Sequence, residues 1–323
     1  MVAITRRQLL TGGAIAAAGG LLAAITPPVF GAEQAPLRVW RYKGSAASFM
    51  GLAGQLDTPY PVEWIDIGGG NLVLEALNSD SLDYVYMSEI PPIFASIAKV
   101  PIALVATISG DVSDIGIVVR NDAGIQQVAD LKGRKISYVR ATNTHYFLLR
   151  LLNQHGLSLK DVQPIPMPIQ EALIAFRSGH LDAVIGGGIS VLQAVQSGGT
   201  RLQNVSDYRG NTLIATTQRA LQDPARSAQV ADFLQRERAT WAWVQNNPEA
   251  WARRNQEITG IDAQLYLDQF RLRGEAQRMV PVSEQSIASQ QQVADAFFEH
   301  QLIRQQVDVR PLWRNDFKQI LES

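Results

Sequence analysis

The sequence predicts an α/β protein with two lobes, each built on a mainly parallel β-sheet. Short apolar runs alternate with helix-like segments between residues 37 and 217, which is typical of parallel strands covered by helices on both faces. After residue 219 the chain becomes mostly helical. About 290 residues remain when an N-terminal leader is set aside, which exceeds one ordinary hydrophobic core and favours two lobes.

The predicted elements follow one another in two series and a helical tail. The first series has strands at 37–40, 62–67, 83–87, 102–109 and 115–120, with helices at 46–56, 72–78 and 93–98. The second has a short helix ending at 130–133, strands at 135–139, 162–167, 181–185 and 212–217, and helices at 142–155, 169–178 and 191–196. The tail has helices at 225–246, 250–259, 262–271 and 283–298. We therefore predict lobe 1 at 33–118 and 216–323, with lobe 2 at 119–215 inserted in it.

Residues 1–32 are typical of an export signal. Arg6 and Arg7 precede an apolar stretch rich in alanine and glycine, and the arginine pair indicates a twin-arginine route. A membrane anchor is the alternative, although the stretch is modest in length and weakly hydrophobic. We expect a periplasmic protein that is not a lipoprotein, because the chain has no cysteine to carry a lipid.

Composition excludes several classes of function. The absence of cysteine removes disulfides, thiolate catalysis and thiolate metal sites. Without Arg6 and Arg7, 27 basic and 30 acidic side chains remain, a net charge of −3 with no basic stripe, so nucleic acid is not an expected partner. The four histidines share no zinc-type spacing, and no phosphate-binding loop is present. We predict no metal, no cofactor and no catalytic residue.

Five apolar runs end in a small or polar loop that opens a helix-like segment. In an open α/β sheet such junctions lie at the carboxyl ends of the strands, where ligands bind. Helix starts there present unpaired N–H groups and a positive dipole end, which favour an anionic ligand. The junctions are Lys43-Gly44-Ser45, Gly68-Gly69-Gly70-Asn71, Ser88-Glu89-Ile90-Pro91, Thr142-Asn143-Thr144 and Gly186-Gly187-Gly188-Ile189-Ser190.

Each junction has a structural and a functional interpretation. The side chains of Thr142, Asn143 and Thr144 should cap a helix, and the same groups could bind a ligand oxygen. The glycines at 68–70 and 186–188, Gly187 and Gly188 among them, either form tight turns or let the backbone approach a ligand.

The charged candidates carry the same ambiguity. Glu89 is a general base or, more simply, a helix cap or dipole partner. Lys43 is a cation for the ligand or an exposed loop lysine, and Arg140, Arg271 and Arg273 are further candidate cations. His145, inside the threonine-rich junction, is a candidate contact.

Several segments, in order along the chain, resemble one family. They are Leu37 to Ser45, Leu74-Glu75-Ala76-Leu77, Ile90-Pro91-Pro92-Ile93-Phe94-Ala95, Val128 to Gly133, Ala175 to Gly179, and the tail from Pro281 to Arg310. The chain is similar over essentially its whole mature length to periplasmic substrate-binding proteins of the aliphatic sulfonate, taurine and nitrate group of ABC transporters.

The resemblance implies a bilobed periplasmic-binding-protein fold of type II, with two crossovers and an oxyanion held between the lobes. It implies closure recognised by a membrane permease with a separate ATPase, and we expect a monomer. The residues that match the family's binding segments are Gly44, Ser45, Gly70, Asn71, Ser88, Glu89, Thr142, Asn143 and Thr144.

Two departures from the family pattern leave the ligand open. Gly186 to Ser190 replace a segment that carries tryptophan and tyrosine in relatives, and Val85, Tyr86 and Met87 replace small residues. The first change should open one side of the binding site and the second should fill the other. Nitrate, taurine, an aromatic sulfonate or a thiamine precursor are alternatives to an aliphatic sulfonate. A ligand-binding sensor is an alternative to transport. A desulfinase on the same scaffold is disfavoured, because those enzymes use a catalytic cysteine.

Overall fold

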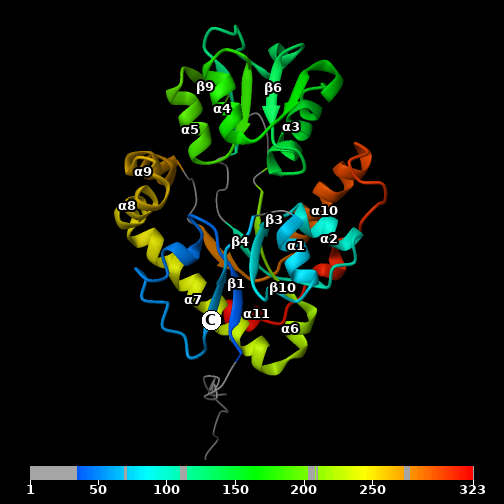
Figure 1. The fold of residues 1–323 in the computed structure, drawn as a ribbon. Helices are drawn as coiled ribbons and strands as arrows, with labels where there is room; N and C mark the ends of the chain where they lie inside the picture. The colour runs from blue at the N-terminus through cyan, green and yellow to red at the C-terminus, as the bar shows by residue number, and fades with distance from the viewer. Residues whose placement is uncertain are drawn as a thin grey trace, which may run out of the picture.

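The computed structural model describes residues 35–68, 71–109, 115–202, 208, 210–272 and 277–322. The predicted export signal lies outside these residues, as do Gly70 and Arg273. The described strands form sheets of two, four and five strands, which build two lobes that lie one above the other in Figure 1. In the described part of the chain, no helix is both long and apolar enough to span a bilayer.

Lobe 1 is built on the strands in the order β2-β1-β3-β10-β4-β11. Strand β1 (Leu37–Trp40) pairs in parallel with β2 (Val62–Ile65), and a bridge between Val39 and Tyr84 joins it to β3 (Val85–Ser88). Strand β10 (Thr212–Thr217) runs antiparallel between β3 and β4 (Ile102–Ser109), and β11 (Arg278–Val280) pairs with β4. The helices of this lobe are α1 (Asn71–Asn78), α2 (Pro91–Ile97), α6 (Gln218–Gln222), α7 (Pro224–Asn246), α8 (Pro248–Thr259), α9 (Ala263–Leu272), α10 (Glu284–Glu299) and α11 (Lys318–Glu322).

Lobe 2 is built on the strand order β7-β6-β8-β5-β9. Its strands are β5 (Gly116–Arg120), β6 (Lys135–Tyr138), β7 (Gln163–Pro166), β8 (Ala183–Gly186) and β9 (Gly199–Arg201). Strands β7, β6 and β8 are parallel, whereas β5 is antiparallel to both of its neighbours. Its helices are α3 (Asn143–Gln154), α4 (Ile169–Arg177) and α5 (Ile189–Gln196). The carboxyl ends of β6 and β8 therefore lead directly into α3 and α5.

The strands do not divide between the lobes at the predicted positions. Strand β5 belongs entirely to the sheet of lobe 2, and β10 belongs entirely to the sheet of lobe 1. The predicted boundaries after residues 118 and 215 therefore fall inside these two strands. Each of these strands makes its backbone hydrogen bonds within one sheet. The chain therefore passes from lobe 1 to lobe 2 before Gly116 and returns to lobe 1 before Thr212.

The helix predicted at residues 46–56 is wrong beyond its first turn. Only Ala46–Ser48 forms a short 3₁₀ helix, and the chain then turns repeatedly up to residue 54. Gly54 adopts a φ of +68°, which ends any right-handed helix at that point. The apolar residues Phe49 and Met50 are buried. The apolar pattern of this segment therefore indicated buried positions and not a continuous helix.

Two buried carboxylates lie in the frame of lobe 1. Asp83 bonds the Arg38 guanidinium in a bidentate manner, at 2.7 and 2.9 Å, and pairs with Arg226 at 3.2 Å. Glu237, on α7, accepts hydrogen bonds from the Tyr84 hydroxyl and from the Trp241 indole. Asp83 has compensating cations, whereas the donors that Glu237 has among the described residues are neutral.

Apolar contacts join the lobes on two sides. On one side, His145 and Tyr146 of α3 lie with ring centroids 5.9 and 6.5 Å from that of Phe297 on α10. On the other, Ile189 at the start of α5 packs against the cluster formed by Phe49, Val244, Trp251, Ala252 and Tyr266. Figure 1 shows the corresponding helices, α3 above α10 and α5 above α9.

The stability of the fold should depend on pH through Glu237. Burial, opposed by the hydrogen bonds from Tyr84 and Trp241, raises the pKa of Glu237 from 4.5 to about 7. Between these values the folded state holds a proton that the unfolded state releases, so this stabilisation is present at low pH and is lost as the pH rises through about 7. The melting temperature of Glu237→Gln, relative to wild type, should be higher by ~2 °C or more at about pH 8 than at about pH 5.

The matched control is Glu284→Gln, because Glu284 is exposed and Arg310 lowers the pKa of its carboxyl. Its difference from wild type should be the same at both pH values. An identical difference for Glu237→Gln at both pH values would contradict the expectation.

Candidate functional site

The start of α3 lies directly after β6, at the carboxyl end of a parallel strand. Thr142 occupies the N-cap position with extended backbone angles, but its side chain makes no capping hydrogen bond. Its hydroxyl donates to the Val139 carbonyl at 2.7 Å, and the Thr144 hydroxyl accepts from the Val139 N–H at 3.0 Å. The predicted side-chain cap is therefore wrong, because both hydroxyls bond the end of the strand instead.

This arrangement leaves the first N–H groups of α3 available to a ligand. Among the described residues, no group accepts a hydrogen bond from the backbone N–H of Thr142, Asn143 or Thr144. Unpaired N–H groups at a helix start carry a partial positive charge and bind anions. The bend that precedes them places Ala141 at a φ of +56°, which a non-glycine residue adopts rarely.

The charge beside this helix start comes from Arg140 rather than from His145. Arg140 is exposed, and no acidic oxygen of the described chain lies within 4 Å of its guanidinium. His145 is buried, its Nδ1 accepts from the Ala141 N–H at 3.3 Å, and its Nε2 has no partner among the described residues. Burial, with smaller effects of Arg140 and His300, lowers the pKa of His145 to about 4, so the ring is neutral at neutral pH.

The glycine junction after β8 forms a tight, self-bonded turn. Gly188 adopts a φ of +57° at the N-cap of α5, and the Ser190 hydroxyl bonds both the N–H and the carbonyl of Gly187. A Cβ on Gly186 would lie 2.4 Å from Ser190 Oγ, so a larger residue there would displace the Ser190 side chain from this turn. Gly187 is exposed and its added Cβ would meet only Ile115, at 3.5 Å. Gly187 therefore has room for a ligand or a larger side chain.

In lobe 1, the loop after β1 presents Lys43, Gly44 and Ser45. Gly44 adopts a φ of +85° and donates its N–H to the Ser48 hydroxyl at 3.3 Å. Lys43 is exposed and has no acidic partner within 4 Å in the described part of the protein. Ser45 is only 2% exposed, and its hydroxyl has no hydrogen-bond partner among the described groups.

Glu89 is fully buried and faces the second crossover rather than an open surface. Its carboxylate accepts from the Tyr208 hydroxyl at 3.1 Å and from Asn211 Nδ2 at 2.7 Å, and its main-chain carbonyl accepts from Gln290 at 3.0 Å. Burial raises the pKa of Glu89 and the hydrogen bonds oppose it. Glu89 is not the cap of α2, because Ile90 holds that position. Its carboxylate is thus not presented to a ligand in this structure.

The remaining predicted residues have mixed positions. Ser88 ends β3 and is half-buried, and Asn71 begins α1. Arg271 is paired with Asp268 of its own helix at 3.3 Å. Val85 and Met87 pack in the core beneath α1 and α2, whereas Tyr86 lies on the opposite face of β3. Strand alternation thus places these three side chains in core clusters on opposite faces of β3.

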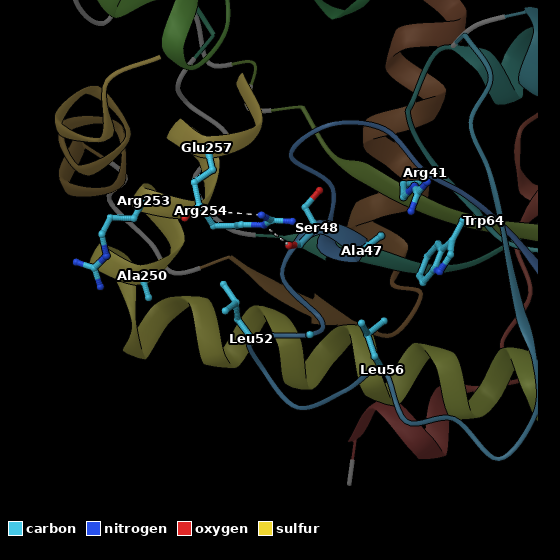
Figure 2. Close-up of a pocket in the computed structure, with 11 residues that line it drawn as sticks. Arg41, Ala47, Ser48, Leu52, Leu56, Trp64, Ala250, Arg253, Arg254 and Glu257 are labelled. Carbon is cyan, nitrogen blue, oxygen red and sulfur yellow. Dashed lines mark hydrogen bonds and ion pairs between the residues drawn. The ribbon is translucent and has the colours of Figure 1, made fainter. Parts of the chain in front are cut away.

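A pocket of about 540 Å³ lies behind the loop after β1, between that loop, Trp64 and α8 (Figure 2). None of the predicted binding residues is among those that line it. Arg41 pairs with Asp66, and Arg254 pairs with Glu257 at 2.9 Å and donates to the Ser48 carbonyl at 3.3 Å. Figure 2 shows Arg254 reaching towards Ser48 while Arg253 points away. The Ser48 hydroxyl in turn accepts a hydrogen bond from the Gly44 N–H. Arg254, which lines this pocket, is therefore linked through Ser48 to the candidate binding loop.

Comparison with known proteins identifies the family. The chain matches the family model described as NMT1/THI5 like over residues 63–251, more than half of its 323 residues. This chain belongs to the NMT1/THI5-like family. A protein of Escherichia coli (strain K12) named "Putative aliphatic sulfonates-binding protein" is 31% identical over 92% of this chain and 95% of that protein. A protein of the same name from Bacillus subtilis (strain 168) is 26% identical over 81% of this chain and 79% of that protein.

Solved structures confirm the predicted fold class. The periplasmic aliphatic sulphonate binding protein SsuA of Escherichia coli superposes with a TM-score of 0.79 and 26% identity, over 88% of this chain and 93% of that chain. The desulfurization enzyme DszB shares the fold alone, with a TM-score of 0.63 and 14% identity over 88% of this chain and 98% of that chain. The fold therefore hosts both binding proteins and an enzyme, and the local chemistry must decide between them.

Among the described residues, no group of three or more His, Asp or Glu side chains could hold a metal ion. The residues that this chain brings to the carboxyl ends of its strands are helix-start N–H groups, hydroxyls and cations. Groups of this kind are suited to binding an anion.

Arg140→Gln should weaken binding of butanesulfonate by about tenfold or more, because one charge-assisted hydrogen bond contributes ~1.5–3 kcal/mol. The melting temperature should stay unchanged, since Arg140 is exposed and has no described ion pair. Isothermal titration calorimetry measures the affinity. The control is Lys160→Gln, which removes a cation from the opposite, amino-terminal end of the strands of lobe 2. Equal affinities for wild type and Arg140→Gln would remove Arg140 from the site.

Proposed function

We propose that this protein is the extracytoplasmic solute-binding component of an ABC importer and that it captures a small sulfonate-like organic anion between its lobes. The observation that supports this most strongly is the start of α3, where N–H groups without an acceptor among the described residues follow Arg140, which has no ion pair among them. The 31% identity to a sulfonate-binding relative along nearly the whole chain supports the same ligand class.

In the proposed complex, lobe 2 holds the sulfonate head. Its oxygens accept hydrogen bonds from the N–H groups of Asn143 and Thr144, and Arg140 supplies the opposite charge. Gly187 approaches from α5, the second helix that starts at this end of lobe 2. Gly44, Ser45 and Lys43 approach from lobe 1. Neither lobe alone surrounds the ligand, so binding favours the state in which the lobes are close together.

The partners follow from this role. The sequence contains no phosphate-binding loop of its own, so a separate ATPase must drive transport through a membrane permease. Export by the leader at residues 1–32 would place the protein in the periplasm. It would act there as a monomer that presents its closed form to the permease.

A thermal-shift screen of the exported, purified protein tests the ligand class. At a concentration of 100 times Kd, a bound ligand adds about 2.7 kcal/mol to the free energy of unfolding. For a chain of this length, that addition should raise the melting temperature by a few degrees, roughly 5 °C. We expect the increase with ethanesulfonate or butanesulfonate and not with butanoate, nitrate, bicarbonate or a thiamine precursor.

Butanoate is the matched control because it keeps the alkyl chain and the charge but lacks the third oxygen. A shift with nitrate or a thiamine precursor, and none with sulfonates, would replace the proposed ligand class. Isothermal titration calorimetry of the responding compound then gives the affinity and the stoichiometry.

A further inference from the structure

Three aromatic rings meet in lobe 1 beside the candidate binding loop. Trp40 ends β1, Tyr42 lies two residues later, and Tyr86 comes from the neighbouring strand β3. The ring centroids are 5.0 Å apart for Trp40 and Tyr42, 5.1 Å for Trp40 and Tyr86, and 4.8 Å for Tyr42 and Tyr86. The Trp40 indole donates to the Ile67 carbonyl at 3.0 Å, which fixes its ring. We call these three residues the aromatic cluster.

Tyr42 is the most exposed residue of the aromatic cluster. Tyr42 is 45% exposed, although it is a large aromatic side chain directly next to Lys43 and Gly44. Burial and the nearby Glu237, opposed by a hydrogen bond with Tyr86, raise the pKa of Tyr42 to about 12, so this exposed side chain is uncharged. A rigid aromatic surface at the carboxyl end of a strand is suited to contact the apolar part of a ligand.

Two buried hydroxyls adjoin this ring. Ser45 and Tyr86 are 2% and 7% exposed, and neither hydroxyl makes a hydrogen bond of good geometry among the described residues. Burial raises the pKa of Tyr86, and hydrogen-bonding interactions with the Ser45 side chain and the Tyr42 main chain oppose that rise, so the Ser45 and Tyr86 hydroxyls face each other. This hydroxyl pair is the polar edge of the aromatic cluster beside the candidate binding loop.

The charges divide the two ends of the ligand between the lobes. Glu237 lies behind the aromatic cluster in lobe 1 and acts electrostatically on both Tyr42 and Tyr86. Glu237 has a pKa of about 7 and is partly ionised at neutral pH, which disfavours an anionic head against this cluster. Lobe 2 offers Arg140 and the start of α3 instead. The head group therefore belongs to lobe 2 and the organic group to lobe 1.

We infer that the ligand is an aromatic sulfonate whose ring stacks on Tyr42 while its sulfonate binds at the start of α3. This inference rests on the proposed function and adds the substrate class and the residue that selects it. Offset stacking of two aromatic rings contributes more than burial of the same area, because their quadrupoles attract. A saturated ring of equal size has no such interaction.

The test compares benzenesulfonate with cyclohexanesulfonate, which have the same head group and nearly the same size. Wild-type protein should bind benzenesulfonate about three- to tenfold more tightly in isothermal titration calorimetry. Tyr42→Leu should abolish that preference, while its affinity for cyclohexanesulfonate stays within about twofold of wild type. Tyr42→Phe is the matched control and should keep the preference, since it retains the ring. Unchanged melting temperatures would show that both variants fold.

Equal wild-type affinity for the two compounds, or an equal loss of both in Tyr42→Leu, would overturn the inference. In that case sulfonate binding that still depends on Arg140 would leave the proposed function intact. If neither cyclic sulfonate binds wild-type protein but butanesulfonate does, only the inference is overturned. If butanesulfonate also fails to bind, the proposed function is overturned as well.

Discussion

The relation between the two lobes depends on one buried carboxylate, that of Glu89. A charged group without exposed surface must be satisfied by donors from the protein, because water cannot reach it. The donors here are Tyr208 and Asn211, both in the second crossover between the lobes. The crossover is thus bonded to the end of β3, and Gln290 bonds the same residue from α10. Lobe 2 would therefore move relative to a crossover that these hydrogen bonds hold against lobe 1.

Tyr208 extends the same constraint to the candidate site. Its ring meets Tyr146 of α3 edge to face, with centroids 4.6 Å apart. The helix that presents its N–H groups to the proposed anion therefore rests, one turn further on, against the residue that bonds Glu89. The sequence places the Glu89 carboxylate beside the ligand, whereas in the structure it is bonded to the residue on which α3 packs. In the proposed complex it would therefore hold α3 in place without facing the anion.

The sequence predicted the elements better than it predicted the atoms of the site. Apolar periodicity located α10 and β4 within one residue, because burial of one face determines that spacing. It failed at residues 46–56, where Phe49 and Met50 are buried by a series of turns. The threonines of α3 were expected to cap the helix, but their hydroxyls have several acceptors within reach, and sequence cannot rank them. The direction of Glu89 and the meeting of Trp40, Tyr42 and Tyr86 depend on strand register, which no local pattern contains.

The contact of Ile189 with lobe 1 has a thermodynamic consequence. This side chain belongs to lobe 2, yet it packs against an apolar cluster of lobe 1 that includes Trp251 and Tyr266. Separating the lobes at this point would expose apolar surface on both sides to water. Hydration of apolar surface raises the heat capacity, so an open form would have a higher heat capacity than the form described here. Ligand-driven closure would then become more exothermic as the temperature rises.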